Sequence, residues 1–140
     1  MKLKTIFTAL TFIAFTQISL AQNVKIKKDI AYVDGVEYVK VEKQAGNMSI
    51  YGLDGEEELI YIKFYDPTPS NKENHDSYYI VRFLDHGLEA EFSGMTRKGV
   101  LKKLYNGKVI KDNKIDEEKM KKFVTKYGTD ESKNKIYING

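Results

Sequence analysis

Cysteine and tryptophan are absent from this 140-residue chain, and proline and histidine occur only twice each. Without cysteine the protein has no disulfide, no thiolate metal site, no cysteine nucleophile and no lipid anchor on a cysteine. Long apolar runs are also scarce, because only the N-terminal one approaches the length of a membrane span. Packing must therefore stabilise the fold, and any function must rest on chemistry other than that of a thiol.

The first 21 residues have the composition of a secretory signal peptide. Lys2 and Lys4 precede an apolar run over residues 5–20. Small residues at Ser19 and Ala21 match the positions that a signal peptidase accepts, so the pattern predicts cleavage after Ala21. The alternative is an uncleaved membrane anchor, but the run has 16 residues, including several threonines. A membrane span needs about 20 mostly apolar residues.

Residues 22–140 would then form the exported protein, which we expect to fold as one α+β domain. This length suits a single core that buries roughly 65% of the surface of the unfolded chain. The Ala21-Gln22 junction and the abundance of lysine, tyrosine and asparagine resemble small secreted proteins of Gram-negative bacteria. The expected location is the periplasm or the cell exterior, with no transmembrane segment after residue 21.

The front half of the chain predicts antiparallel hairpins. β-rich runs are joined by turn residues of the types that hairpins favour. The expected strand pairs are residues 30–33 with 36–41 through Asp34-Gly35, residues 48–53 with 56–65 through Asp54-Gly55, and residues 78–84 with 88–93 through Asp85-His86-Gly87. Leu88, Ala90 and Phe92 alternate with polar residues, which indicates a sheet with one dry face and one wet face.

The back half predicts two amphipathic helices that cover the dry face. The first spans residues 96–106, and the second starts at Asp116, whose carboxylate can cap free backbone amides, and ends at Gly128. Residues 135–138 predict a short final strand, with residues 129–134 as its connector. The expected architecture is an antiparallel sheet of about five to six strands, built from hairpins, with two C-terminal amphipathic helices packed on one face. A closed barrel is the alternative.

Charge is divided unevenly along the chain. Residues 22–93 hold 8 basic and 14 acidic side chains, whereas residues 94–140 hold 13 basic and 6 acidic ones. The basic half indicates attraction to an anionic surface or self-association, although lysines also keep amphipathic helices soluble. The candidate binding residues on the two predicted helices are Lys98, Lys102, Lys103, Lys119, Lys122 and Lys126.

The polar connection over residues 66–76 is a second candidate contact surface. It is the longest such connection in the chain and contains both prolines, Pro67 and Pro69, together with His75. Long connections are often functional, and prolines stiffen them, but flexibility alone is the favoured explanation of the composition.

The remaining polar clusters predict little chemistry. His75 and His86 each adjoin an aspartate, but the strand between them holds them roughly 30 Å apart at about 3.3 Å per residue. The acidic run 56–58 lacks the spacing of a calcium loop. The many strand tyrosines, Tyr32, Tyr38, Tyr61 and Tyr79 among them, suit sheet packing, whereas an exposed row of them would indicate a sugar-binding or protein-binding face.

We therefore hypothesise a non-enzymatic exported binding or interaction protein without a metal or cofactor. Its candidate partners are an exported protein, a glycan or an anionic envelope surface. Nucleic acid is disfavoured because no aromatic stacking motif lies among the lysines. Two alternatives stay open: a small exported hydrolase that uses histidine and carboxylate groups, and a structural or stress-related envelope protein.

Overall fold

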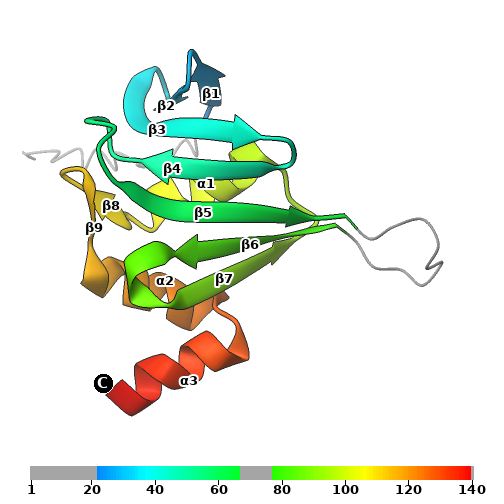
Figure 1. Ribbon diagram of the computed structural model, residues 1–140, viewed down its shortest axis with the longest axis vertical. Helices are drawn as coiled ribbons and strands as arrows, with labels where there is room; N and C mark the ends of the chain where they lie inside the picture. The colour runs from blue at the N-terminus through cyan, green and yellow to red at the C-terminus, as the bar shows by residue number, and fades with distance from the viewer. Residues whose placement is uncertain (1–21, 67–76, 140) are drawn as a thin grey trace, which may run out of the picture.

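The computed structural model describes residues 22–66 and 77–139. Over these residues, seven antiparallel strands follow one another in chain order across a single sheet, and a separate two-stranded hairpin and three α-helices accompany it (Figure 1). The sheet strands are β1 (Val24–Lys27), β2 (Ile30–Val33), β3 (Val36–Gln44), β4 (Asn47–Tyr51), β5 (Glu58–Tyr65), β6 (Tyr78–Phe83) and β7 (Leu88–Ser93). The α+β class and the antiparallel hairpin sheet are confirmed.

The sheet has more strands than the five to six predicted, because the sequence analysis missed β1. Lys28 and Asp29 join β1 to β2, and both have positive φ angles, of 47° and 65°. A two-residue turn of this type usually carries asparagine or glycine, since most side chains disfavour positive φ. The Lys-Asp pair therefore gives no recognisable turn signal in the sequence.

The predicted hairpin turns occur at the expected places. Asp34 and Gly35 have φ angles of 51° and 81°, which is the double positive turn expected between β2 and β3. Gly87 takes the left-handed conformation at φ 62° after a short 3-10 turn, Leu84–His86. The turn at Asp54-Gly55 is looser than predicted, because β4 ends at Tyr51 and β5 starts only at Glu58.

The two predicted helices form, and Asp116 caps the second as predicted. Helix α1 (Arg97–Asn106) follows Thr96, whose hydroxyl accepts a hydrogen bond from the backbone N–H of Gly99 at 3.1 Å. Helix α2 (Glu117–Tyr127) follows Asp116, whose carboxylate accepts one from the N–H of Lys119 at 3.1 Å. Between them lies a small hairpin that the sequence analysis missed, β8 (Ile110–Lys111) with β9 (Lys114–Ile115).

Both helices cover the inner face of the sheet, as predicted (Figure 1). On β7, the residues Leu88, Ala90 and Phe92 are buried, so the expected alternation is confirmed. Phe123 of α2 packs against Phe83 and Phe92, with ring centroids 5.9 and 5.8 Å apart. Fully burying one such side chain contributes about 1.5–3 kcal/mol, so these contacts fix the helices on the sheet.

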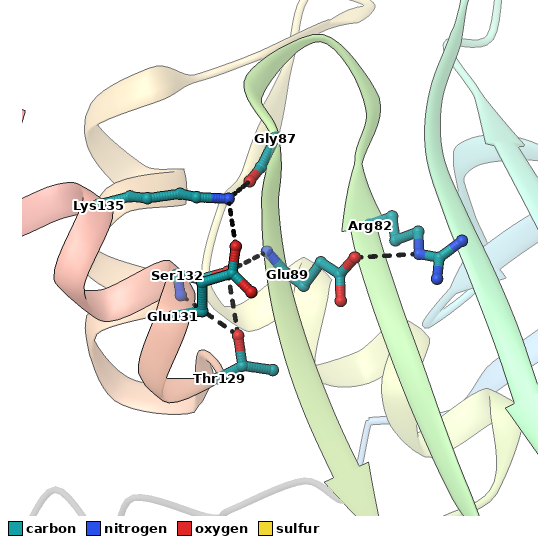
Figure 2. A network of polar contacts seen from close by, with 7 residues as sticks. All are labelled: Arg82, Gly87, Glu89, Thr129, Glu131, Ser132 and Lys135. Carbon is teal, nitrogen blue, oxygen red and sulfur yellow. Dashed lines mark hydrogen bonds and ion pairs between the residues drawn. The ribbon is translucent and has the colours of Figure 1, made fainter.

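The predicted final strand over residues 135–138 is wrong, because this segment belongs to a third helix, α3 (Asp130–Asn139). The chain reaches the edge of β7 before the helix starts: Thr129 donates its backbone N–H to the carbonyl of Glu89 at 3.2 Å. The hydroxyl of Ser132 accepts a hydrogen bond from the backbone N–H of Glu89 at 2.8 Å (Figure 2). The edge of β7 at Glu89 is thus already occupied when the chain reaches residue 135.

Local contacts then favour the helix. The hydroxyl of Thr129 accepts a hydrogen bond from the N–H of Ser132 at 3.3 Å, which caps the first turn. Lys135 pairs with Glu131 one turn earlier at 2.9 Å and donates to the carbonyl of Gly87 at 3.4 Å (Figure 2). Of the apolar residues that suggested a strand, Ile136 packs against the core, whereas Tyr137 and Ile138 are 72% and 81% exposed.

Within the described ranges, no helix combines the length and the apolar character that crossing a membrane requires.

Candidate functional site

The structure separates the six lysines that the sequence singled out into two groups. Lys103, Lys119, Lys122 and Lys126 line one groove between α1 and α2, a cavity of about 580 Å³. Lys98 and Lys102 lie on α1 but do not line this groove. The complete lining is Lys103, Asn106, Gly107, Lys108, Lys119, Lys122, Phe123, Lys126 and Tyr127, and we call it the lysine groove.

The C-terminal end of α1 forms one wall of the lysine groove. Gly107 follows this helix and lies directly on Phe123, because a Cβ atom added at Gly107 would meet the phenyl ring at 2.8 Å. Phe123 is itself almost completely buried in the core. Any side chain at position 107 would therefore displace the aromatic floor or fill the groove.

Helix α2 forms the opposite wall. Lys119, Lys122 and Lys126 follow one another at intervals of three and four residues, which places them along one side of a helix. Phe123 and Val124 turn toward the sheet and are buried. The same amphipathic pattern that docks α2 therefore directs these lysines toward the end of α1.

Two lysines from different helices lie close to the ring of Tyr127. The ammonium nitrogens of Lys103 and Lys126 lie 5.5 and 5.1 Å from the centroid of its ring. A side-chain hydrogen bond from Lys126 is the main reason why the pKa of Tyr127 is lowered from its ordinary value. Partial burial opposes this shift, whereas the charge of Lys103 reinforces it.

The positive charges of the groove are poorly neutralised. Among the described residues, Lys122 is the one groove lysine with a carboxylate within 4.0 Å, that of Glu118 at 3.1 Å. This pair is exposed and lies on a single helix, so it contributes only about 0.3–0.5 kcal/mol. Five ammonium groups around one depression raise the local concentration of anions.

The sequence analysis missed several groove residues. Neither Lys108 nor Tyr127 is among the candidate binding residues that the sequence predicts. Tyr127 does pack on the core, but it is only half-buried. The helical spacing of Lys119, Lys122 and Lys126 was a usable signal for one wall, whereas no pattern in the sequence indicates that α1 faces it.

The histidines and the acidic run supply no metal site in the described part of the chain. His75, Pro67 and Pro69 lie outside the described residues. His86 borders a smaller cavity of about 280 Å³, whose lining also includes Glu57, Asp85 and Glu117. Over residues 22–66 and 77–139, no group of three or more histidine, aspartate or glutamate side chains is arranged to hold a metal ion.

The outer face of the sheet carries tyrosines that pair with their own neighbours. Tyr65 and Tyr78 lie opposite each other on β5 and β6 and stack at 4.9 Å, and Lys63 lies over the ring of Tyr65. The hydroxyl of Tyr51 donates to Glu42 at 3.3 Å. Tyr79 points the other way, into the core. These contacts favour sheet packing as the role of the strand tyrosines.

Comparison of the chain with protein-family models, with curated proteins and with solved structures finds no match. The lysine groove is therefore the feature of this chain that indicates a function.

Proposed function

We propose that this chain is a small exported binding protein that uses the lysine groove to bind an anionic partner at the cell envelope. The observation that carries the proposal is the convergence of Lys103, Lys119, Lys122 and Lys126, from two helices, on one depression. Lysines that only keep a helix soluble need not face one another across a groove. Repulsion among these like charges is relieved when an anion enters.

The size and composition of the groove suit a ligand with several negative charges. A volume of about 580 Å³ lies within the range of small-molecule sites, which are roughly 300–1,000 Å³. Its floor combines the rings of Phe123 and Tyr127 with ammonium groups on the walls. A ligand with a compact body and charged substituents matches this arrangement.

The location comes from the sequence of the N-terminus. The predicted signal peptide over residues 1–21 supports export, which brings the groove to anionic lipids and glycans rather than to nucleic acid. Sequencing the N-terminus of the protein recovered from the periplasm or medium tests this step, and Gln22 is the expected first residue.

Binding to anionic surfaces tests the proposed function. We expect the protein to co-sediment with vesicles that contain phosphatidylglycerol and not with vesicles of phosphatidylcholine alone. Because a lysine near such a surface contributes about 1 kcal/mol, the double substitution Lys119→Gln and Lys122→Gln should weaken binding roughly 30-fold. Lys98→Gln with Lys102→Gln removes the same charge outside the groove and is the matched control.

Two results would contradict the proposal. If the control variant loses as much affinity as the groove variant, net charge and not the groove governs binding. If the unmodified protein binds neither these vesicles nor a sulfated polysaccharide such as heparin, it is not a binder of anionic surfaces.

A further inference from the structure

The surroundings of Tyr127 allow the ligand of the lysine groove to be specified further, and this inference rests on the proposed function. The side chain of Tyr127 lies on two aromatic rings of the core. Its ring packs on Phe123 and Phe92, with centroids 5.0 and 5.1 Å apart. The phenol oxygen is thus a fixed hydrogen-bonding group at the end of the groove.

Two ammonium groups meet at this fixed phenol without a counter-ion. Lys103 approaches from α1 and Lys126 from α2, and both lie within 5.5 Å of the centre of the ring. Within the described residues, neither forms an ion pair with a carboxylate. Each ammonium group is attracted to the ring, but the two positive charges repel each other, so the arrangement suits an anion that would bridge them.

The donor set favours one shape of anion. Arginine forks bind carboxylates and phosphates through two parallel hydrogen bonds, but the lining of the groove contains no arginine, so an anion there is held by separate donors. Lysine acts as a point charge with rotatable donors and is a common phosphate ligand. Two ammonium groups and one hydroxyl, one from α1 and two from α2, match the several oxygens of a tetrahedral anion.

Neighbouring charges indicate on which side the rest of the ligand lies. Lys126 and Tyr127 also border a second depression, whose lining includes the acidic residues Glu91 and Asp130 as well as Lys133. A ligand with further negative charges gains little net attraction on that side, because Glu91 and Asp130 offset Lys126 and Lys133. It is attracted toward Lys108, Lys119 and Lys122 on the other.

We propose that Lys103, Lys126 and the hydroxyl of Tyr127 form a subsite for one phosphate group of the anionic ligand, whose remaining charges extend along the lysine groove. The phosphate belongs either to a lipid headgroup or to a soluble phosphorylated molecule. Bound phosphate draws the two ammonium groups away from the ring of Tyr127 and accepts a hydrogen bond from its hydroxyl.

The test follows the tyrosine ring signals by NMR during titration with inorganic phosphate at constant ionic strength, with Tyr127→Phe to assign the residue. We expect the Tyr127 signals to shift and to saturate. Since a hydrogen bond to a charged group contributes about 1.5–3 kcal/mol, Tyr127→Phe should weaken phosphate binding at least about tenfold. Lys103→Gln with Lys126→Gln should abolish saturation, whereas Lys98→Gln with Lys102→Gln should not.

Vesicles of phosphatidylglycerol distinguish a lipid headgroup from a soluble molecule as the source of the phosphate. Saturation by free phosphate with the expected losses supports a soluble ligand. Tyr127-dependent binding to vesicles, with no saturation by free phosphate, supports a lipid headgroup. Circular dichroism melting of each variant verifies that a loss of binding does not reflect unfolding.

The outcomes distinguish failure of the subsite from failure of the proposed function. If vesicle binding requires Lys119 and Lys122 while Tyr127→Phe and the Lys103/Lys126 pair leave it unchanged, the phosphate subsite is wrong and the groove function stands. Equal losses in the Lys98/Lys102 control overturn the subsite in favour of unspecific attraction. Absence of binding to phosphate and to vesicles overturns the subsite, and if heparin is not bound either, the proposed function is overturned as well.

Discussion

Adjacent residues on one helix take different roles in this protein. Lys102 and Lys103 are neighbours in the sequence, yet only Lys103 lines the groove. Successive residues on an α-helix point about 100° apart, since a turn contains 3.6 residues. The direction in which the side chain points, rather than its charge, therefore decides whether a lysine lines the groove. Lys98 and Lys102 are suitable controls for this reason.

The hydroxyl group of Tyr38 lowers the stability of the folded protein. Its hydroxyl is buried without a hydrogen-bond partner in the described part of the chain, while its ring packs edge-on against Tyr105 at 5.1 Å. Leaving a buried polar group unsatisfied costs about 1–3 kcal/mol. We expect Tyr38→Phe to leave the free energy of unfolding unchanged or to raise it by up to about 1 kcal/mol in urea titrations, because the ring contact remains.

The same residue predicts a loss of stability in alkali. Burial, with a smaller contribution from Tyr105, raises the pKa of Tyr38. The ordinary pKa of tyrosine is about 10, so above that pH the unfolded chain ionises while the folded chain keeps a neutral phenol. The stabilisation present below about pH 10 is therefore lost as the pH rises. Stability should fall less steeply for Tyr38→Phe, and parallel curves would contradict this assignment.

At the scale of elements, α3 closes one edge of the sheet. Ser132 is 2% exposed and its hydroxyl accepts the backbone hydrogen bond that Glu89 of β7 offers (Figure 2). An edge strand with free backbone groups invites pairing with another chain. The docking of α3 therefore both satisfies Glu89 and protects β7.

Ser132→Ala tests this role. The change leaves a buried N–H without its partner, and we expect a loss of about 1–3 kcal/mol in the free energy of unfolding. Hydrogen exchange at the amide of Glu89 should accelerate as α3 detaches. Ser93→Ala, at an exposed position on the same strand, is the control and should change stability by less than about 0.5 kcal/mol. Unchanged exchange at Glu89 would show that Ser132 does not hold α3.

At the scale of the whole molecule, the sheet and helices share one hydrophobic cluster. Within the described residues, this cluster joins Val24 of β1, at one edge, to Phe92 of β7 at the other, and includes Leu101 of α1 and Phe123 of α2. Neither layer buries its apolar face without the other.

A shared core predicts cooperative unfolding. We expect urea unfolding curves followed by far-ultraviolet circular dichroism and by near-ultraviolet tyrosine signals to coincide, since helices and sheet lose their packing together. Helical signal that disappears at a lower urea concentration than the tyrosine signal would contradict this expectation and show that α1 and α2 unfold separately.

Features of this protein that depend on local chemistry can be predicted from its amino-acid sequence. Asp34-Gly35 predicts its turn because few residue pairs tolerate two positive φ angles, and Asp116 predicts the start of α2 because a side-chain oxygen must cap free amides. The alternation of Leu88, Ala90 and Phe92 predicts a one-sided sheet. The turn at Lys28 and Asp29 escaped prediction because those residues are not typical of the conformation they adopt.

Features that depend on contacts between distant segments of the chain could not be predicted in this way. Residues 135–138 have strand-like composition, but contacts of Thr129 and Ser132 with Glu89 occupy the edge of β7 at that point, and the segment becomes helical. The lysine groove arises in the same way. Spacing places lysines along one side of α2, yet only packing on a common sheet brings Lys103 of α1 to Tyr127, because no sequence pattern encodes which faces of two separate helices oppose each other.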